Sequence, residues 1–369
     1  MQYRRRLYEK YRFLVSKRLI LAAAVEYNVL VMQVDFLTSL ISVGIMIALA
    51  VPGFILKRLN MLPEKAVAAL VAVLIYVSQP FLTIDSFLEK DYQPQLLIGM
   101  GISFALSLFF HALIFFIAKL AFSFFKDKRA PENGAEDADA VIGKTDAEKR
   151  ICVIASFMGN VGFMGIPVMK ALFPENPEML IYTAVFILGF NIASWTLGVY
   201  TVTGDRKNIS FKRALLNPPT AALAVALPLF FFKSYIPADV MTPVSSGVGY
   251  LADMTLPLSM MILGIRLAEI RFKSLFTDAK VYLVCFIKLI AAPLICLGIT
   301  LLIRLAFPSL ERSVIITAYI VMAMPAASLS LTFAEMFDGD RATAVKNTIL
   351  TTLLSVITIP ILMLLCSFV

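Results

Sequence analysis

The chain alternates between long apolar stretches and short polar loops. A helix needs about 20 consecutive apolar residues to cross a bilayer, and ten stretches of about that length recur along the chain. The sequence therefore predicts an all-α polytopic membrane protein with ten transmembrane helices. These helices, called spans one to ten, cover residues 36–57, 66–87, 96–124, 150–172, 179–202, 218–235, 245–266, 279–306, 311–335 and 343–368.

Positive charge is distributed unequally between the loops. The loops after the odd-numbered spans hold nineteen Lys and Arg residues, whereas those after the even-numbered spans hold five. Because cytoplasmic loops are enriched in Lys and Arg, both ends of the ten-helix bundle are expected outside the cytoplasm. The expected location is the plasma membrane, in a bacterium the inner membrane, with the lipid bilayer as a partner. The net charge of +8 follows from these loops, and no nucleic acid is expected to bind.

The first 34 residues form a basic extension that departs from this pattern. Its opening, MQYRRRLYEKYRFLVSKR, carries seven positive charges although it would lie outside the cytoplasm. Two interpretations stay open. Either the extension forms an eleventh helix at the membrane interface, or native translation starts at Met32 and residues 1–31 are not native. We favour the second.

The two halves of the chain echo one another. Four matched positions recur in the same order, at offsets of 176, 176, 177 and 158 residues. The pairs are Pro52 with Pro228, Lys57 with Lys233, Pro80 with Pro257, and Pro167 with Pro325. Because each half holds an odd number of spans, the second half must cross the bilayer upside down. We therefore expect a first five-helix repeat over 35–202, with a cytoplasmic loop at 126–149, a linker at 203–217, and a second, inverted five-helix repeat over 218–369.

Span four contains the stretch FMGNVGFMGIPV, residues 157–168, which a plain membrane helix does not need. Pro167 cannot donate a backbone hydrogen bond. Gly159, Gly162 and Gly165 let the chain unwind and let other backbones approach. Unpaired backbone groups cost several kcal/mol each in lipid, so such a break persists only against protein or a water-filled cavity. The sequence therefore predicts an interrupted helix.

A matching break is expected in span nine, in the stretch AMPAASLSLTF, where Ser328 follows Pro325. Half-helices that start at Pro167 and Pro325 would point their N-terminal dipoles at one place. This arrangement favours a carboxylate or similar anion by about 0.3–2 kcal/mol per helix end, and the amide of Asn160 would complete the site. Inverted repeats with interrupted helices in matching positions are typical of secondary transporters.

The stretches NVGFMGIPV, KALFPE and AMPAASLSLTFAEMF resemble the auxin efflux carrier family, which includes PIN-type plant members and bacterial relatives. The resemblance covers residues 34–369. It implies that broken helices four and nine cross at Pro167 and Pro325. It also implies a scaffold of helices 1, 2, 6 and 7, and a transport core of helices 3–5 and 8–10 that slides as an elevator. By the same resemblance, Asn160 and Asn191 line an organic-anion site.

Two departures from the plant pattern favour small carboxylates over auxin. The chain lacks a long central cytoplasmic loop, and Ala326 stands where plant members have a polar residue. We therefore expect a bacterial-type efflux carrier of small organic anions that works by alternating access. A sodium-coupled organic-anion symporter of the bile-acid type and a membrane sensor that binds a ligand without moving it stay open as alternatives. The direction of transport, coupling to H+ or Na+, and a homodimeric assembly stay open as well.

Two charged residues within the spans are candidates for coupling or for stabilising charge. Lys288 lies about ten residues into span eight, too deep for easy snorkelling. Asp253 is the carboxylate that the sequence places deepest, just before Pro257. The alternative is a structural ion pair or charges that face a cavity. For Asn191, the alternative to a role in the site is a hydrogen bond between helices.

The sequence does not favour an enzyme. It contains one histidine, His111, and shows no Ser/His or paired-Asp arrangement within the spans. The four cysteines lie in apolar runs without CxxC spacing, so neither a metal site nor a disulfide framework is expected. No cofactor is expected.

Overall fold

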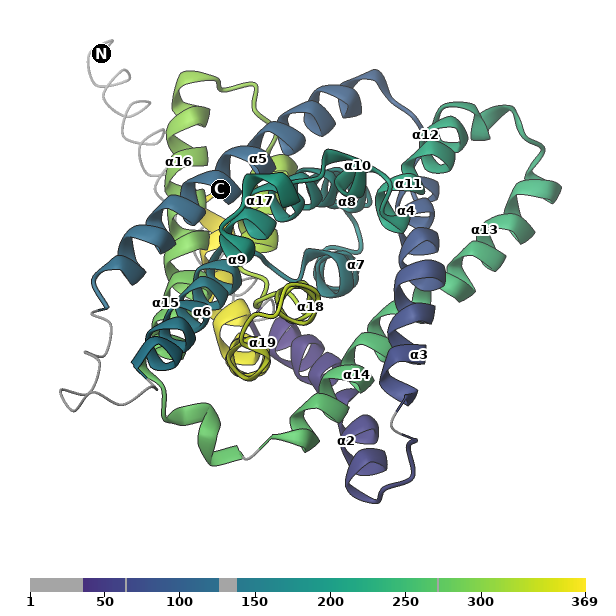
Figure 1. The fold of residues 1–369 in the computed structure, drawn as a ribbon. Helices are drawn as coiled ribbons and strands as arrows, with labels where there is room; N and C mark the ends of the chain where they lie inside the picture. The colour runs from purple at the N-terminus through teal and green to yellow at the C-terminus, as the bar shows by residue number, and fades with distance from the viewer. Residues whose placement is uncertain (1–35, 64, 126–137, 271) are drawn as a thin grey trace, which may run out of the picture.

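A computed structural model describes residues 36–63, 65–125, 138–270 and 272–369, and the regular elements in this part of the chain are all helices (Figure 1). The basic extension at 1–34 and residues 126–137 of the predicted loop lie outside the described residues. In chain order the helices are α2 (Ala50–Arg58), α3 (Ala66–Val73), α4 (Gln79–Leu88), α5 (Pro94–Ser123), α6 (Ala138–Phe157), α7 (Ile166–Leu172), α8 (Glu178–Ala193), α9 (Val199–Thr203), α10 (Phe211–Leu215), α11 (Pro218–Ala221), α12 (Leu223–Phe232), α13 (Ala238–Asp253), α14 (Thr255–Glu269), α15 (Ala279–Phe286), α16 (Ala292–Ala306), α17 (Arg312–Met322), α18 (Leu329–Met336) and α19 (Arg341–Met363).

Seven continuous helices of the described residues are long and apolar enough to cross a membrane, so the chain is a multi-pass membrane protein. They coincide with predicted spans one, two, three, five, seven, eight and ten. Their bounds are Phe36–Arg58, Ala66–Leu88, Pro94–Ser123, Glu178–Thr203, Ala238–Glu269, Ala279–Ala306 and Arg341–Cys366. An eighth candidate, at span six, is a pair of helices bent by 41°, Arg206–Leu215 and Pro218–Tyr235.

Spans four and nine are interrupted, as the glycines and prolines predict. In span four, α6 ends at Phe157, and a second helical segment of twelve residues follows at Val161–Leu172. In span nine, α17 ends at Met322 and α18 begins at Leu329. Each of the two spans therefore consists of two helical pieces joined by a short non-helical stretch.

The loop predicted at 126–149 is shorter than expected. Residues 138–149 belong to α6, which runs on without a break from Ala138 to Phe157. Ala, Glu and Lys, which are common in this stretch, are good helix formers, so the polar composition marks a helix end that leaves the apolar region rather than a linker.

Widened helical turns interrupt four of the membrane segments. They lie at Leu74–Ser78, Val161–Gly165, Ser194–Gly198 and Ile287–Ala291. Three of them are followed within two residues by a proline, at Pro80, Pro167 and Pro293. Because proline cannot donate to the preceding turn and its ring crowds that turn, a wider turn absorbs the mismatch without ending the helix.

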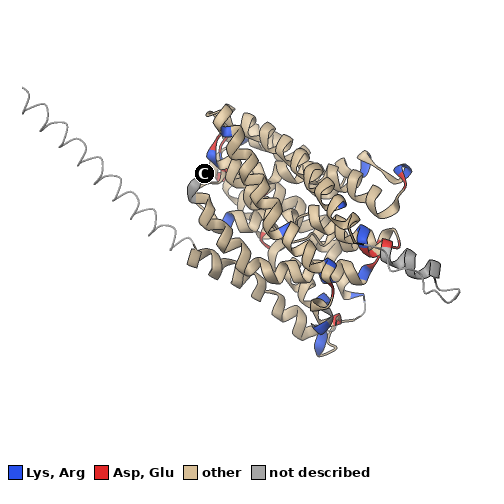
Figure 2. Ribbon diagram, turned by 90° about the vertical axis from the view of Figure 1, so that its left-hand side faces the viewer, with Lys and Arg blue, Asp and Glu red and all other residues tan. Residues whose placement is uncertain are grey.

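Lys and Arg gather at the ends of the helices, and the middle of the bundle is largely free of charge (Figure 2). Lys57 at the end of α2 pairs with Glu269 at the end of α14 at 3.0 Å. We call this end of the bundle, where α2, α14 and α18 finish, the basic end. The continuous helix Ala66–Leu88 starts near it and runs to the opposite end, where Lys170 of α7 pairs with Glu89 at 2.8 Å.

Helices α2 and α14 touch backbone to backbone. A β-carbon added to Gly264 would lie 1.9 Å from the carbonyl oxygen of Ala50, and one added to Gly53 would lie 2.1 Å from that of Met261. Such distances are far inside van der Waals contact, so no side chain fits between the two helices. In lipid there is no hydrophobic driving force between helices, so membrane helices associate through close van der Waals packing, which small residues at the interface allow.

Replacing Gly264 with Ala should therefore force α2 and α14 apart and destabilise the protein by at least about 2 kcal/mol. The measurement is the melting temperature of the purified protein in detergent. Gly298→Ala in α16 is the matched control, because a β-carbon there meets nothing within 4 Å. Equal melting temperatures for the two variants would contradict the close contact.

Candidate functional site

The non-helical stretches of spans four and nine lie against each other and pair as a short antiparallel bridge between Gly159 and Ala326. The N–H of Asn160 donates to the carbonyl oxygen of Pro325 at 2.7 Å, and the N–H of Ala327 donates to that of Met158 at 2.9 Å. Each break thus satisfies backbone groups of the other. This reciprocal pairing, called the crossing below, explains how unwound backbone persists inside an apolar bundle.

The prolines do not start the half-helices, and this part of the sequence prediction is wrong. Pro167 lies inside the helical segment Val161–Leu172, seven residues after Asn160, because the widened turn before it accommodates the missing N–H. Pro325 lies in the non-helical stretch, and α18 starts four residues later at Leu329. The helix starts that face the crossing are therefore Val161 and Leu329.

Two further helical segments hold the crossing in place. The Thr351 hydroxyl of α19 accepts a hydrogen bond from the N–H of Ala326 at 3.0 Å. Lys288, which is fully buried, donates from Nζ to the carbonyl oxygen of Met322 at 3.1 Å. A β-carbon added to Gly159 would lie 2.9 Å from the same Nζ. The sequence made Lys288 a candidate for coupling or for stabilising charge, and the structure places its ammonium group at the crossing.

The carboxylate expected to lie deepest does not. Asp253 is exposed at the end of α13, whereas Asp85, in α4, is 8 % exposed and contacts Lys170 at 3.3 Å. No described ion pair joins Lys288 to Asp253. The helical register explains the difference, because Asp253 falls on the outward side of α13 while Asp85 faces α7.

Backbone donors stay free at both helix starts beside the crossing. Within the described residues, the N–H groups of Gly162 and Phe163 in span four form no hydrogen bond, nor do those of Ser328 and Leu329 in span nine. The side-chain amide of Asn160, 6 % exposed, has no described partner either. Free N–H groups at a helix start form a ready binding site for an anion.

A cavity of about 120 Å³ borders these helix starts. It lies among the helix that carries α3, helices α14, α18 and α19, and Phe163 of span four. Its lining is mostly apolar, with polar groups at the two ends of α18. The lining residues are Val71, Leu74, Ile75, Phe163, Ser259, Ile262, Leu263, Arg266, Ser328, Leu329, Leu331, Thr332, Glu335, Val345, Thr348 and Ile349.

Gln79 is a residue near the crossing that the sequence interpretation missed. A β-carbon added to Gly162 would lie 2.3 Å from Nε2 of Gln79, so the glutamine side chain occupies the space beside this glycine. The signal was present as a Ser78–Gln79 pair before Pro80 in the middle of an apolar span. For Gly165, by contrast, the atoms nearest to an added β-carbon belong to Val161 and Thr183, at 3.3 and 3.6 Å.

Asn191 has partners of its own away from the crossing. Its amide donates to the hydroxyl of Thr220 at 2.8 Å and to Oδ1 of Asn217 at 3.4 Å. These bonds tie α8 to the start of α11, and no described contact links Asn191 to Asn160. The geometry favours the alternative in which Asn191 joins helices.

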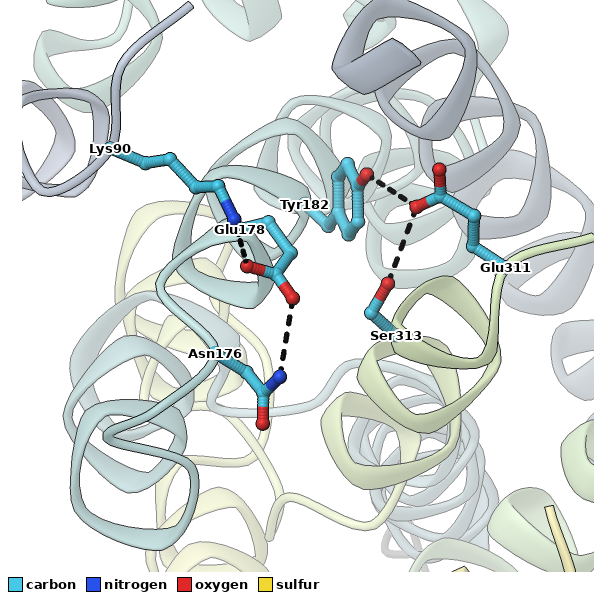
Figure 3. Close-up of polar contacts among 6 residues, drawn as sticks. All are labelled: Lys90, Asn176, Glu178, Tyr182, Glu311 and Ser313. Atoms are coloured by element: carbon cyan, nitrogen blue, oxygen red, sulfur yellow. Dashed lines mark hydrogen bonds and ion pairs between the residues drawn. The ribbon is translucent and has the colours of Figure 1, made fainter. Parts of the chain in front are cut away.

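A polar network ties the opposite end of the bundle (Figure 3). Lys90 pairs with Glu178 at the start of α8 at 2.7 Å, and Asn176 donates to the same carboxylate at 3.3 Å. The hydroxyl of Tyr182 donates to Glu311 at 2.9 Å. The loop after α4 and the starts of α8 and α17 are therefore held together at that end.

Comparisons with known proteins agree with the membrane architecture. Residues 206–363 match the family described as membrane transport protein. A protein of Methanocaldococcus jannaschii, named an uncharacterized transporter, is 26% identical over 327 residues, which cover 85% of this chain and 94% of the relative. A protein of Methanothermobacter thermautotrophicus with the same description is 27% identical over 330 residues, covering 88% of this chain and 98% of the relative.

Replacing Thr351 with Val should destabilise the crossing. Valine has the shape of threonine but leaves the N–H of Ala326 buried without an acceptor, which costs about 1–3 kcal/mol. The matched control is Thr352→Val, because the Thr352 hydroxyl bonds only to its own helix, at Thr348. The melting temperature in detergent should fall more for Thr351→Val, and an equal fall would mean that Thr351 does not hold the crossing.

Proposed function

We propose that this chain, which belongs to the membrane transport protein family of the auxin efflux carriers, is a secondary transporter that exports small organic anions, foremost carboxylates. It is a membrane transporter and not an enzyme. The observation that carries the proposal is the crossing. Two interrupted helices meet there, and Phe163, Ser328 and Leu329, which lie at the helix starts beside it, line one cavity.

The anion would bind beside the crossing. The free N–H groups at Gly162, Phe163, Ser328 and Leu329 are uncharged donors at positive helix ends, and each helix end contributes about 0.3–2 kcal/mol towards an anion. The unpartnered amide of Asn160 supplies a further donor. The apolar lining would face the uncharged part of the anion, since pockets for small molecules combine apolar walls with a few placed polar groups.

Movement would follow an inverted-repeat plan. We assign residues 35–202 and 218–369 to two inverted five-helix repeats, with helices 1, 2, 6 and 7 as the scaffold and helices 3–5 and 8–10 as the transport core. Matching breaks in spans four and nine support this assignment, because such breaks at corresponding positions mark the site of inverted-repeat transporters. The core would slide against the scaffold to expose the anion on either side. The positive charge of its loops supports a cytoplasmic position for the basic end.

The position of Lys288 disfavours the sodium-coupled alternative. Its ammonium group lies at the crossing and already uses the carbonyl oxygen of Met322, an oxygen of the kind that a sodium ion would need. We therefore expect transport that does not require sodium and is driven by protons or by the membrane potential. A measurement of anion flux distinguishes the transporter from the sensor, because a sensor would bind anions without moving them across the membrane.

Transport by purified protein in proteoliposomes tests the proposal, with radiolabelled butyrate, benzoate, succinate and malate, with and without sodium. Wild-type protein should give saturable flux of at least one anion. Asn160→Ala should lower that flux at least about tenfold while leaving the melting temperature unchanged, because the lost amide bonds to anion and not to protein.

Asn191→Ala is the matched control and should behave in the opposite way. Its amide bonds to Thr220 and Asn217. Losing these bonds should lower the free energy of unfolding by about 1 kcal/mol, which lowers the melting temperature. Full flux through Asn160→Ala would remove Asn160 from the site. Binding of an anion by wild-type protein without any flux would favour the sensor.

A further inference from the structure

We propose that Arg266 is the protein group that first binds the carboxylate of the transported anion at the basic end, and that the anion displaces Glu335 from it. This inference rests on the proposed function as an anion carrier. It adds a residue that recognises the anion about one helix length away from the crossing.

The cavity runs along the whole of α18. Ser328 and Leu329, at the start of this helix, line one part of the cavity, and Glu335, one residue from its end, lines another. Eight helical residues extend about 12 Å, so the cavity connects the free N–H groups near the crossing with the basic end of the bundle. An anion arriving from that end meets the Arg266–Glu335 pair before it meets the helix starts.

Arg266 is the only Lys or Arg among the described residues that line the cavity, and Glu335 is the only acid. A guanidinium group recognises a carboxylate through two parallel N–H donors, which suits it to choose anions at the mouth of an otherwise apolar cavity. The lining thus supplies one site for negative charge at the basic end and a second site, made of backbone N–H groups, at the other end of α18.

The bonds that Arg266 makes now are loose and exchangeable. Nη2 lies 3.5 Å from Oε1 of Glu335, and Nη1 lies 3.3 Å from Oε2 of Glu269. Both exceed the 2.7–2.9 Å that is typical of a tight charged bond. The side chains of Arg266 and Glu335 are 28% and 40% exposed, so water screens the pair and makes it weak. A carboxylate of the substrate can replace that of Glu335 at little cost.

The exchange would also release α18 from α14. Arg266 belongs to span seven, which we assign to the scaffold, and Glu335 belongs to the second half of span nine, in the core. The opposite end carries a comparable link with the charges reversed, between Lys170 in the second half of span four and Glu89, directly after span two, at 2.8 Å. Glu89 and Arg266 are 177 residues apart, the offset that also separates Pro80 from Pro257. Each end therefore holds an ion pair between one half of a broken span and the scaffold.

Equilibrium binding to the purified full-length protein in detergent tests the inference. The probes are butyrate, benzoate, succinate and malate, and the tightest of them for wild-type protein is used with the variants. Arg266→Gln should raise its Kd at least about tenfold, whereas Glu335→Gln should lower the Kd, because it removes one of the two carboxylates that compete for Arg266, the one that lines the cavity. The opposite changes in Kd distinguish the two roles. If the ion pair only held two helices together, breaking it by either substitution would shift the Kd in the same direction.

Arg58→Gln is the matched control. It removes one positive charge from the basic end without touching the cavity lining and should leave the Kd unchanged. Unaltered binding in both cavity variants, or weaker binding in Glu335→Gln, would overturn the role of Arg266 while anion flux by wild-type protein still upheld the proposed function. Failure of wild-type protein to bind or carry any of the four anions would overturn both.

Discussion

The structure depends on one constraint: backbone polar groups that leave a helix inside a membrane must find partners within the protein, because lipid offers none. The two interrupted spans meet this constraint for each other. Asn160 and Ala327 donate across the crossing, and the Thr351 hydroxyl accepts from the N–H of Ala326, which the bridge itself does not pair. Lys288 donates a hydrogen bond to the carbonyl oxygen of Met322, the last residue of α17. Neither break would be stable without the other, so the two spans must fold against each other.

This solution also creates the candidate site. Pairing uses the N–H groups that lie within the bridge, but the donors of the following helical turns point past it and stay free. Close approach of the two chains requires small residues at the bridge, and Gly159 and Ala326 are the residues found there. Ala326, the residue that departs from the plant pattern, is fully buried opposite Gly159, and its N–H bonds to Thr351 of α19, so a larger side chain would have little room there.

The sequence predicted the membrane segments well and the interior of the site less well. Hydropathy located the spans because a helix that crosses the bilayer must be predominantly apolar along its whole length. The breaks were predicted in the right spans, and in span four the unwinding falls at Gly159 and Asn160, at the beginning of the predicted glycine-rich stretch. The half-helix that follows begins at Val161, six residues before Pro167, because a widened turn accommodates the proline. The contacts of Arg266 are tertiary and leave no local signal, whereas Gln79 stands out in the sequence as a polar residue before Pro80 within an apolar span. The depth of Asp253 was predicted wrongly because hydropathy does not give the direction in which a side chain points.

The same hydrogen bonds limit how the molecule can move. Sliding one break past the other would expose several backbone groups at once, so spans four and nine would have to travel as a unit with α19 and the segment that carries Lys288. The contact between α2 and α14 is equally rigid, since two glycines bring their backbones together. Between these two rigid parts lie an apolar cavity and weak, partly solvated ion pairs, which can be broken without leaving buried backbone unpaired. Any large motion of this protein is therefore expected at that boundary, where the anion would also bind.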